Sequence, residues 1–368
     1  RYIQENGKII FAFAMKYIYN KNKEEYITNV KNGRKNMITI KDVARLAEVS
    51  ISTVSRVIND SKPVSPEVRK RVLKVIEETG YKPNDVARSL VTRRSYLIGV
   101  IVNNLAHSYV ADVVRGIEEI GKMYGYDILL CSSYGSKETQ EKYLQLLDRK
   151  QAEGLFLVGN VFDEDIVKSA KSLKKPCVFF TRDIRENINH ITVDCYSAIY
   201  DVTKYLFEEG HRKIAYFSDF ENRTTVENEK VEGYLKAVED NKTDYSKIYV
   251  VGGNKHSKAY DFGTSIINEA RDFTACVCSS DEIAIGILDS FLDNGINVPG
   301  DVSVVGFGNI REGKFVRPEL TTIGEPYYDV GAVGMRMLIK MIKGDKTQQG
   351  RMELPFTIEK RKSVKSLN

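Results

Sequence analysis

The sequence predicts an α/β protein in which a small all-α helix-turn-helix head is joined by a hinge helix to a two-lobed body of doubly wound parallel sheets. Two short amphipathic helices, separated by a tight break, occupy residues 38–59. From residue 97 onward, apolar strands alternate with amphipathic helices in two successive series. Such alternation is typical of parallel sheets covered by helices, and two series indicate two lobes.

The head begins with a helix start signal at Thr39. The Thr39 side chain can cap a helix, and Asp42, three residues later, completes a capping box. After a two-residue break, Ser50 caps a second helix that buries Val54 and Val57. The outward side chains of this second helix are Ile51, Ser52, Ser55 and Arg56. The second helix of such a pair enters the DNA major groove. A helical hairpin inside a larger core is the alternative interpretation.

A third helix and a hinge follow the helix pair. Ser65 caps the third helix with Pro66 at its first position, and Gly80 ends it. Residues 84–90 can form about two turns of helix, which is too short to be stable alone in water. We expect this segment to order on a partner, where Leu90 suits an apolar wedge in the DNA minor groove. A plain linker is the alternative interpretation.

The body consists of two series of strands and helices. Ligands of parallel α/β sheets bind at the carboxyl ends of the strands, so two facing lobes would hold a solute between them. The first series has strands at 97–102, 128–131, 155–158 and 178–180, with helices at about 109–124, 138–150 and 164–173. The second has strands at 214–217, 248–251, 275–278 and 302–306, with helices at about 197–209, 229–240, 257–270 and 281–294.

The charge of the chain is unevenly distributed. Of 368 residues with a net charge of +5, residues 37–96 hold 12 Lys and Arg against 7 Asp and Glu, whereas residues 97–368 hold 35 against 40. A basic head on an acidic body is typical of a polyanion-binding module attached to a solute sensor. No apolar run approaches the roughly 20 residues that span a bilayer. The five scattered cysteines favour reduced thiols, and we expect a cytoplasmic protein with no membrane partner.

Residues 1–36 do not resemble part of a folded domain. They are rich in Lys, Asn and Tyr, and Met37 stands immediately before the first expected helix. We hypothesise that Met37 is the natural start and that residues 1–36 are a translated leader, disordered or not native. A basic arm that follows DNA phosphates is the alternative interpretation.

Six motifs in order resemble the lactose-repressor/galactose-repressor family of bacterial transcription regulators. The resemblance covers about residues 37–362 and implies a periplasmic-binding-protein-like body. It also implies a homodimer whose two recognition helices bind a pseudo-palindromic double-stranded DNA operator. The motifs are Thr-Ile-Lys-Asp-Val-Ala at 39–44, Val-Ser-Ile-Ser-Thr-Val-Ser-Arg-Val-Ile-Asn at 49–59, Val-Ala-Arg-Ser-Leu at 86–90, Gly-His-Arg-Lys-Ile-Ala at 210–215, Val-Pro-Gly-Asp-Val-Ser-Val-Val-Gly-Phe at 298–307 and Pro-Glu-Leu-Thr-Thr-Ile at 318–323.

The resemblance also implies roles for residues of the head. Arg56 best suits a bidentate bond to guanine, whereas phosphate contacts position the head without carrying sequence information. The expected base-reading residues are Ile51, Ser52, Arg56, Ala87 and Leu90. The expected phosphate contacts are Thr39, Ser50, Thr53, Ser55, Asn59 and Ser65.

The sequence pattern and the resemblance together divide the chain into a leader (1–36), a head (37–83), a hinge helix and linker (84–96) and an effector-binding, dimerising body (97–368). Lobe 1 comprises about 97–195 and 326–346, and lobe 2 about 196–325 and 347–368. Three crossovers connect the lobes. The expected effector contacts are Asn104, Tyr109, Ser133, Asn160, Arg182, Asp194, Lys230, Asn254, Asp281 and Asn309.

Three positions depart from the family pattern. Gly308 stands where a ligand-binding aspartate is usual, Lys230 replaces an arginine, and Asn254 replaces a stacking aromatic residue. A cleft with less carboxylate and less stacking fits a neutral sugar poorly, so an acidic or phosphorylated sugar, or another metabolite, stays open beside an ordinary carbohydrate.

The sequence therefore predicts a DNA-binding transcriptional regulator, most simply a repressor, whose operator binding is controlled by a small-molecule effector, a sugar or sugar derivative. No enzyme is expected, because the four histidines lack metal-ligand spacing and neither a phosphate-binding loop nor a nucleophile elbow is present. No cofactor is expected. A free solute-binding protein, and a regulator that responds to a non-sugar metabolite, are the alternatives.

Overall fold

The chain divides into two compact units, residues 1–94 and 95–368. The computed structural model describes residues 38–60, 62–81, 94–182, 188–219, 224–253, 255–268, 272–345, 347 and 350–368. The expected leader and residues 82–93, which include most of the expected hinge, lie outside the described residues.

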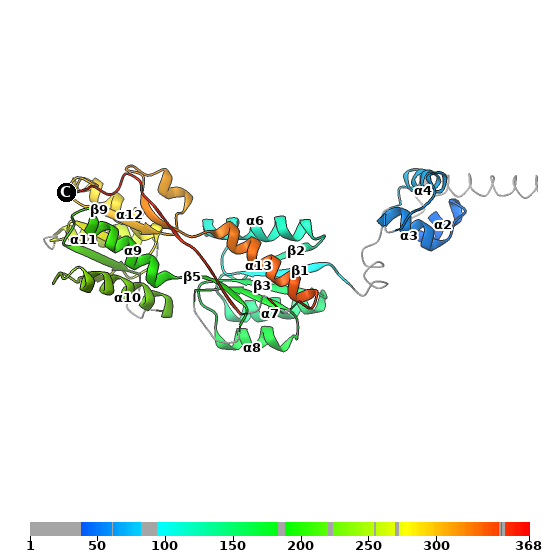
Figure 1. The fold of residues 1–368 in the computed structure, drawn as a ribbon, viewed down its shortest axis with the longest axis horizontal. Coiled ribbons are helices and arrows are strands. Elements are labelled where there is room, and N and C mark those ends of the chain that lie inside the picture. The colour runs from blue at the N-terminus through cyan, green and yellow to red at the C-terminus, as the bar shows by residue number, and fades with distance from the viewer. Residues whose placement is uncertain are drawn as a thin grey trace, which may run out of the picture. The chain divides into compact units, whose positions relative to one another are not determined.

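The first unit contains the three predicted helices, α2 (Ile40–Leu46), α3 (Ile51–Asn59) and α4 (Pro66–Thr79) (Figure 1). Their starts and stops follow the sequence signals: Pro66 occupies the first turn of α4, and Gly80 ends it in the left-handed conformation at φ 63°. One small core joins the three helices. Its buried members are Val43, Ala44, Leu46, Ala47, Val54, Val57, Val72 and Val75. The predicted helix-turn-helix head is therefore confirmed.

The second unit contains two six-stranded sheets, as the alternating pattern predicted. The strands of the first sheet, in spatial order, are β11 (Arg351–Leu354), β5 (His190–Val193), β4 (Cys177–Phe180), β3 (Gly154–Val158), β1 (Leu97–Val102) and β2 (Asp127–Ser132). Those of the second are β12 (Thr357–Glu359), β10 (Thr321–Gly324), β9 (Ser303–Phe307), β8 (Ala275–Cys278), β6 (Ile214–Ser218) and β7 (Ile248–Val250). Among the residues that the structure describes, every strand pairing is parallel except that of β12 with β10.

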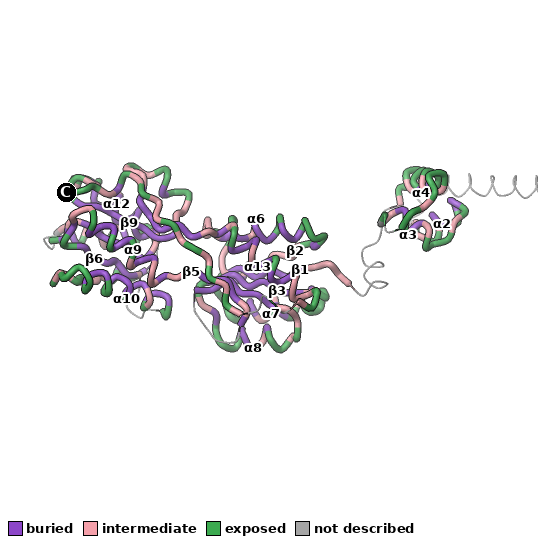
Figure 2. The backbone as a smooth tube through the Cα atoms, viewed as in Figure 1, coloured by how far each residue is buried: buried purple, intermediate pink, exposed green. Residues whose placement is uncertain are grey.

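Helices cover both faces of each sheet, which explains the continuous apolar runs of the central strands. In β1, Ile98, Val100 and Val102 pack on one face of the sheet, and Ile101 packs on the other. A strand buried on both faces reads as an uninterrupted hydrophobic segment. Figure 2 shows this burial along the central strands of the first sheet.

The helices of the first lobe are α6 (Ser108–Met123), α7 (Lys137–Arg149), α8 (Glu164–Ser172) and α13 (Tyr327–Ile342). Those of the second are α9 (Cys195–Glu208), α10 (Thr225–Asp240), α11 (His256–Asn268), α12 (Asp281–Asp293) and the short 3-10 helix η1 (Arg311–Lys314).

The chain passes between the two sheets three times. It leaves the first sheet after β5, returns after β10 to form α13, and leaves again between β11 and β12. Strand β11 pairs with β5 in register from Arg351 to Leu354, so this part of residues 347–368 lies in the first sheet, whereas the sequence placed the whole segment in lobe 2. The pairing joins residues far apart in sequence, which local patterning does not predict.

Helices α6 and α13 approach each other closely on one face of the first sheet (Figure 1). A Cβ atom on Gly331 would lie 2.0 Å from the carbonyl oxygen of Val113, and one on Gly116 would lie 2.2 Å from that of Tyr328. Glycine is thus required at both positions, because the obstructing atoms are backbone and cannot rotate away.

Replacing Gly331 with alanine is expected to lower the free energy of unfolding of the body by about 1–3 kcal/mol, because the new methyl group forces the two helices apart. Urea unfolding followed by circular dichroism measures this change. Gly121→Ala on α6 is the matched control, since a Cβ there would first meet the Cδ1 atom of Ile128 at 3.1 Å, the end of a movable side chain. Equal losses in the two variants would contradict the close backbone contact.

Within the described part of the chain, no helix has both the length and the apolar character needed to cross a membrane.

Candidate DNA-binding surface and effector site

Helix α3 has two sides of different character. Val54 and Val57 are buried in the head core, whereas Ile51, Ser52 and Arg56 are exposed. Three of the five side chains that the sequence assigned to base reading therefore share the solvent-facing side of one helix. Arg56 contributes a guanidinium group, whose planar donors match the acceptor pair of guanine in the major groove.

The first turn of α3 presents a cluster of hydroxyl groups. The Oγ atom of Ser50 accepts a hydrogen bond from the backbone N–H of Thr53 at 3.1 Å, which caps the helix. The hydroxyl groups of Ser52 and Thr53 each lie 2.8 Å from the same Oγ. Hydroxyl groups beside a helix N-terminus are suited to phosphate contacts, because unpaired N–H groups and the helix dipole favour an anion there.

The other residues assigned to DNA have different environments. The exposed Thr39 donates its hydroxyl to the carboxylate of Asp42 at 2.7 Å, within the predicted capping box. Ser65 precedes α4 as expected and is exposed, but its side chain makes no capping hydrogen bond. Ser55 is half-buried on α3. Ala87 and Leu90 lie outside the described residues, as does the side chain of Asn59, the last residue of α3.

Most residues assigned to the effector follow strands of the two sheets. Because parallel strands end on the same edge, their following residues gather there. In the first sheet, Asn104 follows β1, Ser133 follows β2, Asn160 follows β3, Arg182 follows β4 and Asp194 follows β5. In the second, Asp281 follows β8 and Asn309 follows β9. The two edges approach each other, since a Cβ atom on Gly308 would lie 3.5 Å from the hydroxyl of Tyr327 at the start of α13.

Arg182 is the centre of a buried polar network at this edge. Its Nε donates to Oε1 of Glu325 at 2.8 Å, and its Nη2 donates to Oε2 of the same carboxylate. Its Nη1 donates to Oδ1 of Asn160, and its guanidinium carbon lies 5.9 Å from the ring centroid of Tyr109. The hydroxyl of Tyr327 donates to Oε2 of Glu325 at 2.6 Å. Three expected effector residues, Tyr109, Asn160 and Arg182, therefore lie together.

Glu325 and Tyr327 were not among the predicted site residues. They follow β10, a strand that the sequence pattern did not predict, so neither residue was expected at the sheet edge. The β-branched run Thr321 to Ile323 was a usable signal, because such residues favour strands.

Both charges of the Arg182–Glu325 pair are maintained inside the protein. The side chains are 7% and 0% exposed. Burial alone would lower the pKa of Arg182 and raise that of Glu325, but each charge stabilises the other. The pKa of Arg182 is therefore raised, and the pKa of Glu325 is lowered.

Lys230 projects from α10 and is buried beside the ends of β8 and β9. Its Nζ donates to the carbonyl oxygen of Ser279 at 2.7 Å and lies 3.9 Å from the ring centroid of Phe307. Ser279 is 3% exposed, and its hydroxyl has no hydrogen-bond partner among the residues that the structure describes. This part of the edge therefore combines a cation with an available hydroxyl.

Asp281 is fully buried at the start of α12. Its Oδ1 accepts from the hydroxyl of Thr322 at 2.5 Å, and its Oδ2 accepts from the backbone N–H of Ile310 at 2.7 Å. Burial raises the pKa of Asp281 to about 7, although both hydrogen bonds oppose the shift. These bonds join α12 to β10 and to the segment after β9, so Asp281 has a structural role whether or not it contacts an effector.

Replacing Asp281 with asparagine is expected to flatten the pH dependence of stability. Because the pKa of this carboxyl is higher in the folded chain than in the unfolded chain, the folded state binds more protons between about pH 4 and 7. The contribution of Asp281 to stability is therefore present at low pH and lost as the pH rises through about 7. Urea unfolding of the wild type and of Asp281→Asn at pH 5.5 and pH 8 measures how the free energy of unfolding changes with pH. Parallel slopes for the two proteins would contradict the raised pKa.

The remaining expected effector residues are engaged in local structure. Asp194 caps α9 by accepting from the backbone N–H of Ser197 at 2.9 Å. Asn104 accepts from the backbone N–H of Ala106 at 2.9 Å. Ser133 is 1% exposed and donates to the carbonyl oxygen of Val102 at 3.2 Å. Asn309, at φ 52°, accepts from Arg361. Asn254 lies outside the described residues.

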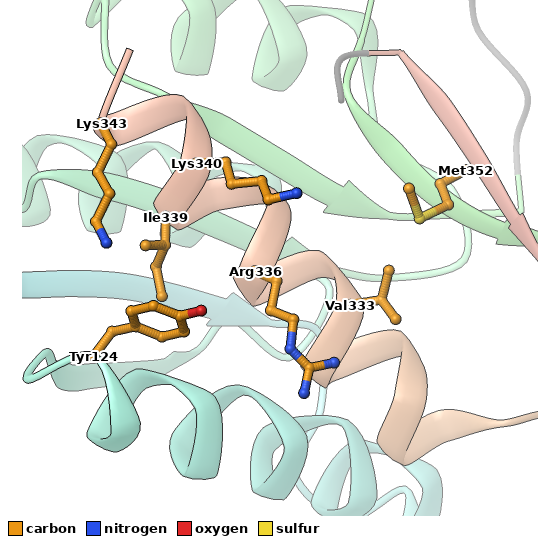
Figure 3. A pocket seen from close by; sticks show the side chains of 7 residues that line it. All are labelled: Tyr124, Val333, Arg336, Ile339, Lys340, Lys343 and Met352. Atoms are coloured by element: carbon orange, nitrogen blue, oxygen red, sulfur yellow. The ribbon is translucent and has the colours of Figure 1, made fainter. Parts of the chain in front are cut away.

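A separate pocket of about 420 Å³ lies on α13 (Figure 3). Three cationic side chains contribute to its wall, and the Nζ atom of Lys343 lies 4.8 Å from the ring centroid of Tyr124. The pocket contains none of the residues assigned to the effector, so it is distinct from the site at the sheet edges. Its lining residues are Tyr124, Val333, Arg336, Ile339, Lys340, Lys343 and Met352.

Two family models match the chain. Residues 39–84 match the model described as bacterial regulatory proteins, lacI family. Residues 95–362 match the model described as periplasmic binding proteins and sugar binding domain of the LacI family. The two matches coincide with the head and with the body.

Individual proteins are similar along nearly the whole chain. Catabolite control protein A of Priestia megaterium is 36% identical over 336 residues, which cover 89% of this chain and 99% of that protein. The HTH-type transcriptional regulator RegA of Clostridium saccharobutylicum is 34% identical, with 89% and 99% covered.

Solved structures show the same arrangement of elements. A lac repressor dimer bound to operator and the anti-inducer ONPF superposes with a TM-score of 0.80 at 25% identity, covering 90% of this chain and 100% of that one. The transcriptional regulator CelR in complex with cellobiose superposes with a TM-score of 0.67 at 26% identity, covering 89% and 99%.

Proposed function

Because this chain belongs to the lacI family of bacterial regulatory proteins, we propose that it is a cytoplasmic repressor that binds a pseudo-palindromic DNA operator as a homodimer. The family consists of DNA-binding transcriptional regulators with an effector-binding domain, and not of enzymes. We propose further that a sugar or sugar derivative, bound between the two lobes, controls operator binding.

The exposed side of α3 is the observation that carries the DNA-binding part of the proposal. Arg56 and Ser52 are exposed on a helix whose opposite side is fixed in the head core by Val54 and Val57. Arg56 is assigned to a guanine, Ser52 to a base edge and Ile51 to a thymine methyl group. The hydroxyl groups of Ser50 and Thr53, at the start of the same helix, are assigned to phosphates.

The polar groups at the two sheet edges support a carbohydrate effector. Sugar recognition requires hydrogen-bond partners for hydroxyl groups and an aromatic surface for the apolar face of the ring. Asn160, Arg182 and Tyr109 supply these in lobe 1, and Lys230 and Ser279 supply polar groups in lobe 2. The structure of the related regulator CelR is that of a complex with cellobiose.

A population shift connects the two sites in this proposal. The effector favours one arrangement of the lobes, and that arrangement sets the separation of the two hinge segments in the dimer. Residues 84–90 are too short to form a stable helix alone, so they fold on DNA only when the separation is suitable. Leu90 then enters the minor groove as a wedge.

A gel-shift assay at two salt concentrations tests the proposal, using a duplex that the protein itself selects from a random pool. We expect tight binding at low salt and a loss of about 10³–10⁵-fold in affinity between about 50 and 200 mM salt, because phosphate contacts release counterions. A panel of carbohydrates, screened by thermal shift, then identifies the effector as the compound that raises the melting temperature. A protein that binds no duplex would instead be a solute-binding protein.

A further inference from the structure

The guanidinium group of Arg182 is already paired with a carboxylate of the protein itself. Nε and Nη2 donate to the two oxygens of Glu325, and Nη1 donates to Asn160. The hydroxyl of Tyr327 holds Oε2 of Glu325 from a second direction, at 2.6 Å. Because Glu325 is attached to the chain and its side chain is 0% exposed, this carboxylate is kept at the guanidinium without any ligand.

The position of Glu325 makes this pairing relevant to ligand choice. Glu325 directly follows β10, beside the edge where β9 ends at Phe307 and Gly308 follows. Gly308 has no side chain, and the space where its Cβ would stand is 3.5 Å from the hydroxyl of Tyr327 and 3.6 Å from Oδ2 of Asp281. Asp281 is committed to Thr322 and Ile310. The carboxylate that faces Arg182 therefore comes from Glu325.

We propose that Glu325 is a specificity-determining residue of the effector site, because it occupies the anion-binding side of Arg182 and restricts this position to uncharged hydroxyl groups. The inference rests on the proposed effector site between the lobes. A ligand carboxylate or phosphate would have to displace a tethered carboxylate and would meet its negative charge in a buried environment. A neutral hydroxyl group can instead donate to the remaining lone pair of the exposed Asn160, and no charge is left unpaired. Where it meets Arg182, the effector is uncharged.

Chemical rescue by acetate tests the proposal on the full-length protein. Glu325→Ala removes the carboxylate and leaves a space beside Arg182 that acetate fits. Melting temperatures are measured in sodium acetate and in sodium chloride at equal ionic strength and pH. We expect acetate to raise the melting temperature of Glu325→Ala by about 5 °C and that of the wild type by less than about 1 °C.

Two further variants separate occupancy of this position from a general effect of acetate. Glu325→Gln keeps the space filled, and the double variant Arg182→Met with Glu325→Ala lacks the cation. Neither should gain from acetate. If Glu325→Ala does not fold in chloride, the folded yield after dilution from urea is compared in the two salts, and a higher yield in acetate is the expected result.

An equal acetate gain in the wild type would overturn the proposal, because Glu325 would then yield to external anions. Absence of any gain or added yield in Glu325→Ala would also overturn it, because Arg182 would then not accept an anion at this position. The experiment contains no DNA, so either result is distinguishable from failure of the operator-binding assay.

Discussion

Replacing Arg182 with methionine is expected to lower the free energy of unfolding of the body by about 3–5 kcal/mol at pH 8, because Glu325 is left as a buried, uncompensated charge. The wild-type pair has side chains that are 7% and 0% exposed, so water cannot replace the lost guanidinium. Methionine retains most of the apolar volume, which limits the contribution of a cavity. Urea unfolding of both proteins measures the difference.

A surface ion pair provides the matched control. The Nζ atom of Lys142 lies 2.8 Å from Oε1 of Glu138, one helical turn earlier on α7. The two side chains are 70% and 77% exposed. Lys142→Met should leave the free energy of unfolding nearly unchanged, because water screens such exposed pairs. Adding Glu325→Leu to Arg182→Met should recover much of the loss, since no buried charge remains. Similar losses of stability in Arg182→Met and Lys142→Met would contradict the expected cost of leaving Glu325 as a buried, unpaired charge.

The pH dependence of the Arg182→Met loss has a defined sign. In the wild type, the guanidinium holds the pKa of Glu325 below its ordinary value, so its contribution to stability is complete above about pH 5 and falls only at lower pH. Without Arg182, burial raises the pKa of Glu325 instead. The variant should then become more stable as the pH falls from 8 to 5, and its deficit relative to the wild type should narrow.

Arg56→Ala is expected to reduce discrimination between the selected operator and an unrelated duplex by about 5–150-fold, equivalent to about 1–3 kcal/mol. Arg56 is exposed on α3, and alanine keeps the helix while removing the only guanidinium of that helix. Competition binding at fixed salt, with both duplexes present, measures the ratio of the affinities for the selected operator and the unrelated duplex.

Lys74→Ala is the control for the charge that Arg56→Ala removes. Lys74 is 73% exposed on α4, a helix not assigned to base reading. Its substitution should weaken binding to both duplexes about equally, or to neither, and should leave the ratio unchanged. A ratio unchanged in Arg56→Ala, or reduced equally in Lys74→Ala, would contradict the assignment of α3 as the reading helix.

The sequence predicted the elements whose signal is local. The strands at 97–102 and 275–278 have the predicted bounds, and the other predicted strands differ by one residue at one or both ends, because apolar runs buried on both faces are distinctive. The helices of the head were found through their caps: Thr39, Ser50 and Gly80 stand where α2 and α3 begin and α4 ends.

The elements that were missed lack such a local signal. Strands β5, β10, β11 and β12 contain three or four residues each, with polar side chains among the apolar ones. The position of β11 depends on its pairing with β5, about 160 residues earlier in the chain. Long-range pairing of this kind is set by the packing of the complete fold, so sequence patterning placed residues 351–354 with the second lobe.

The same distinction applies to the site. Asn160 and Arg182 follow predicted strands, so the sequence placed them at one sheet edge, where a hydrogen bond now joins them. Glu325 follows β10, and its pairing with Arg182 over 143 residues was not accessible from local pattern. The sequence therefore suggested a cleft poor in carboxylates, whereas the structure places a buried carboxylate at its central arginine.

Binding of the full-length protein to its selected duplex, followed by fluorescence anisotropy over a range of salt concentrations, is the most direct test of sequence-specific operator binding by a dimer. We expect two chains per duplex and a linear fall of the logarithm of the binding constant with the logarithm of salt concentration, with a slope of several units. Absence of binding at about 50 mM salt, or equal affinity for every duplex, would contradict a sequence-specific regulator.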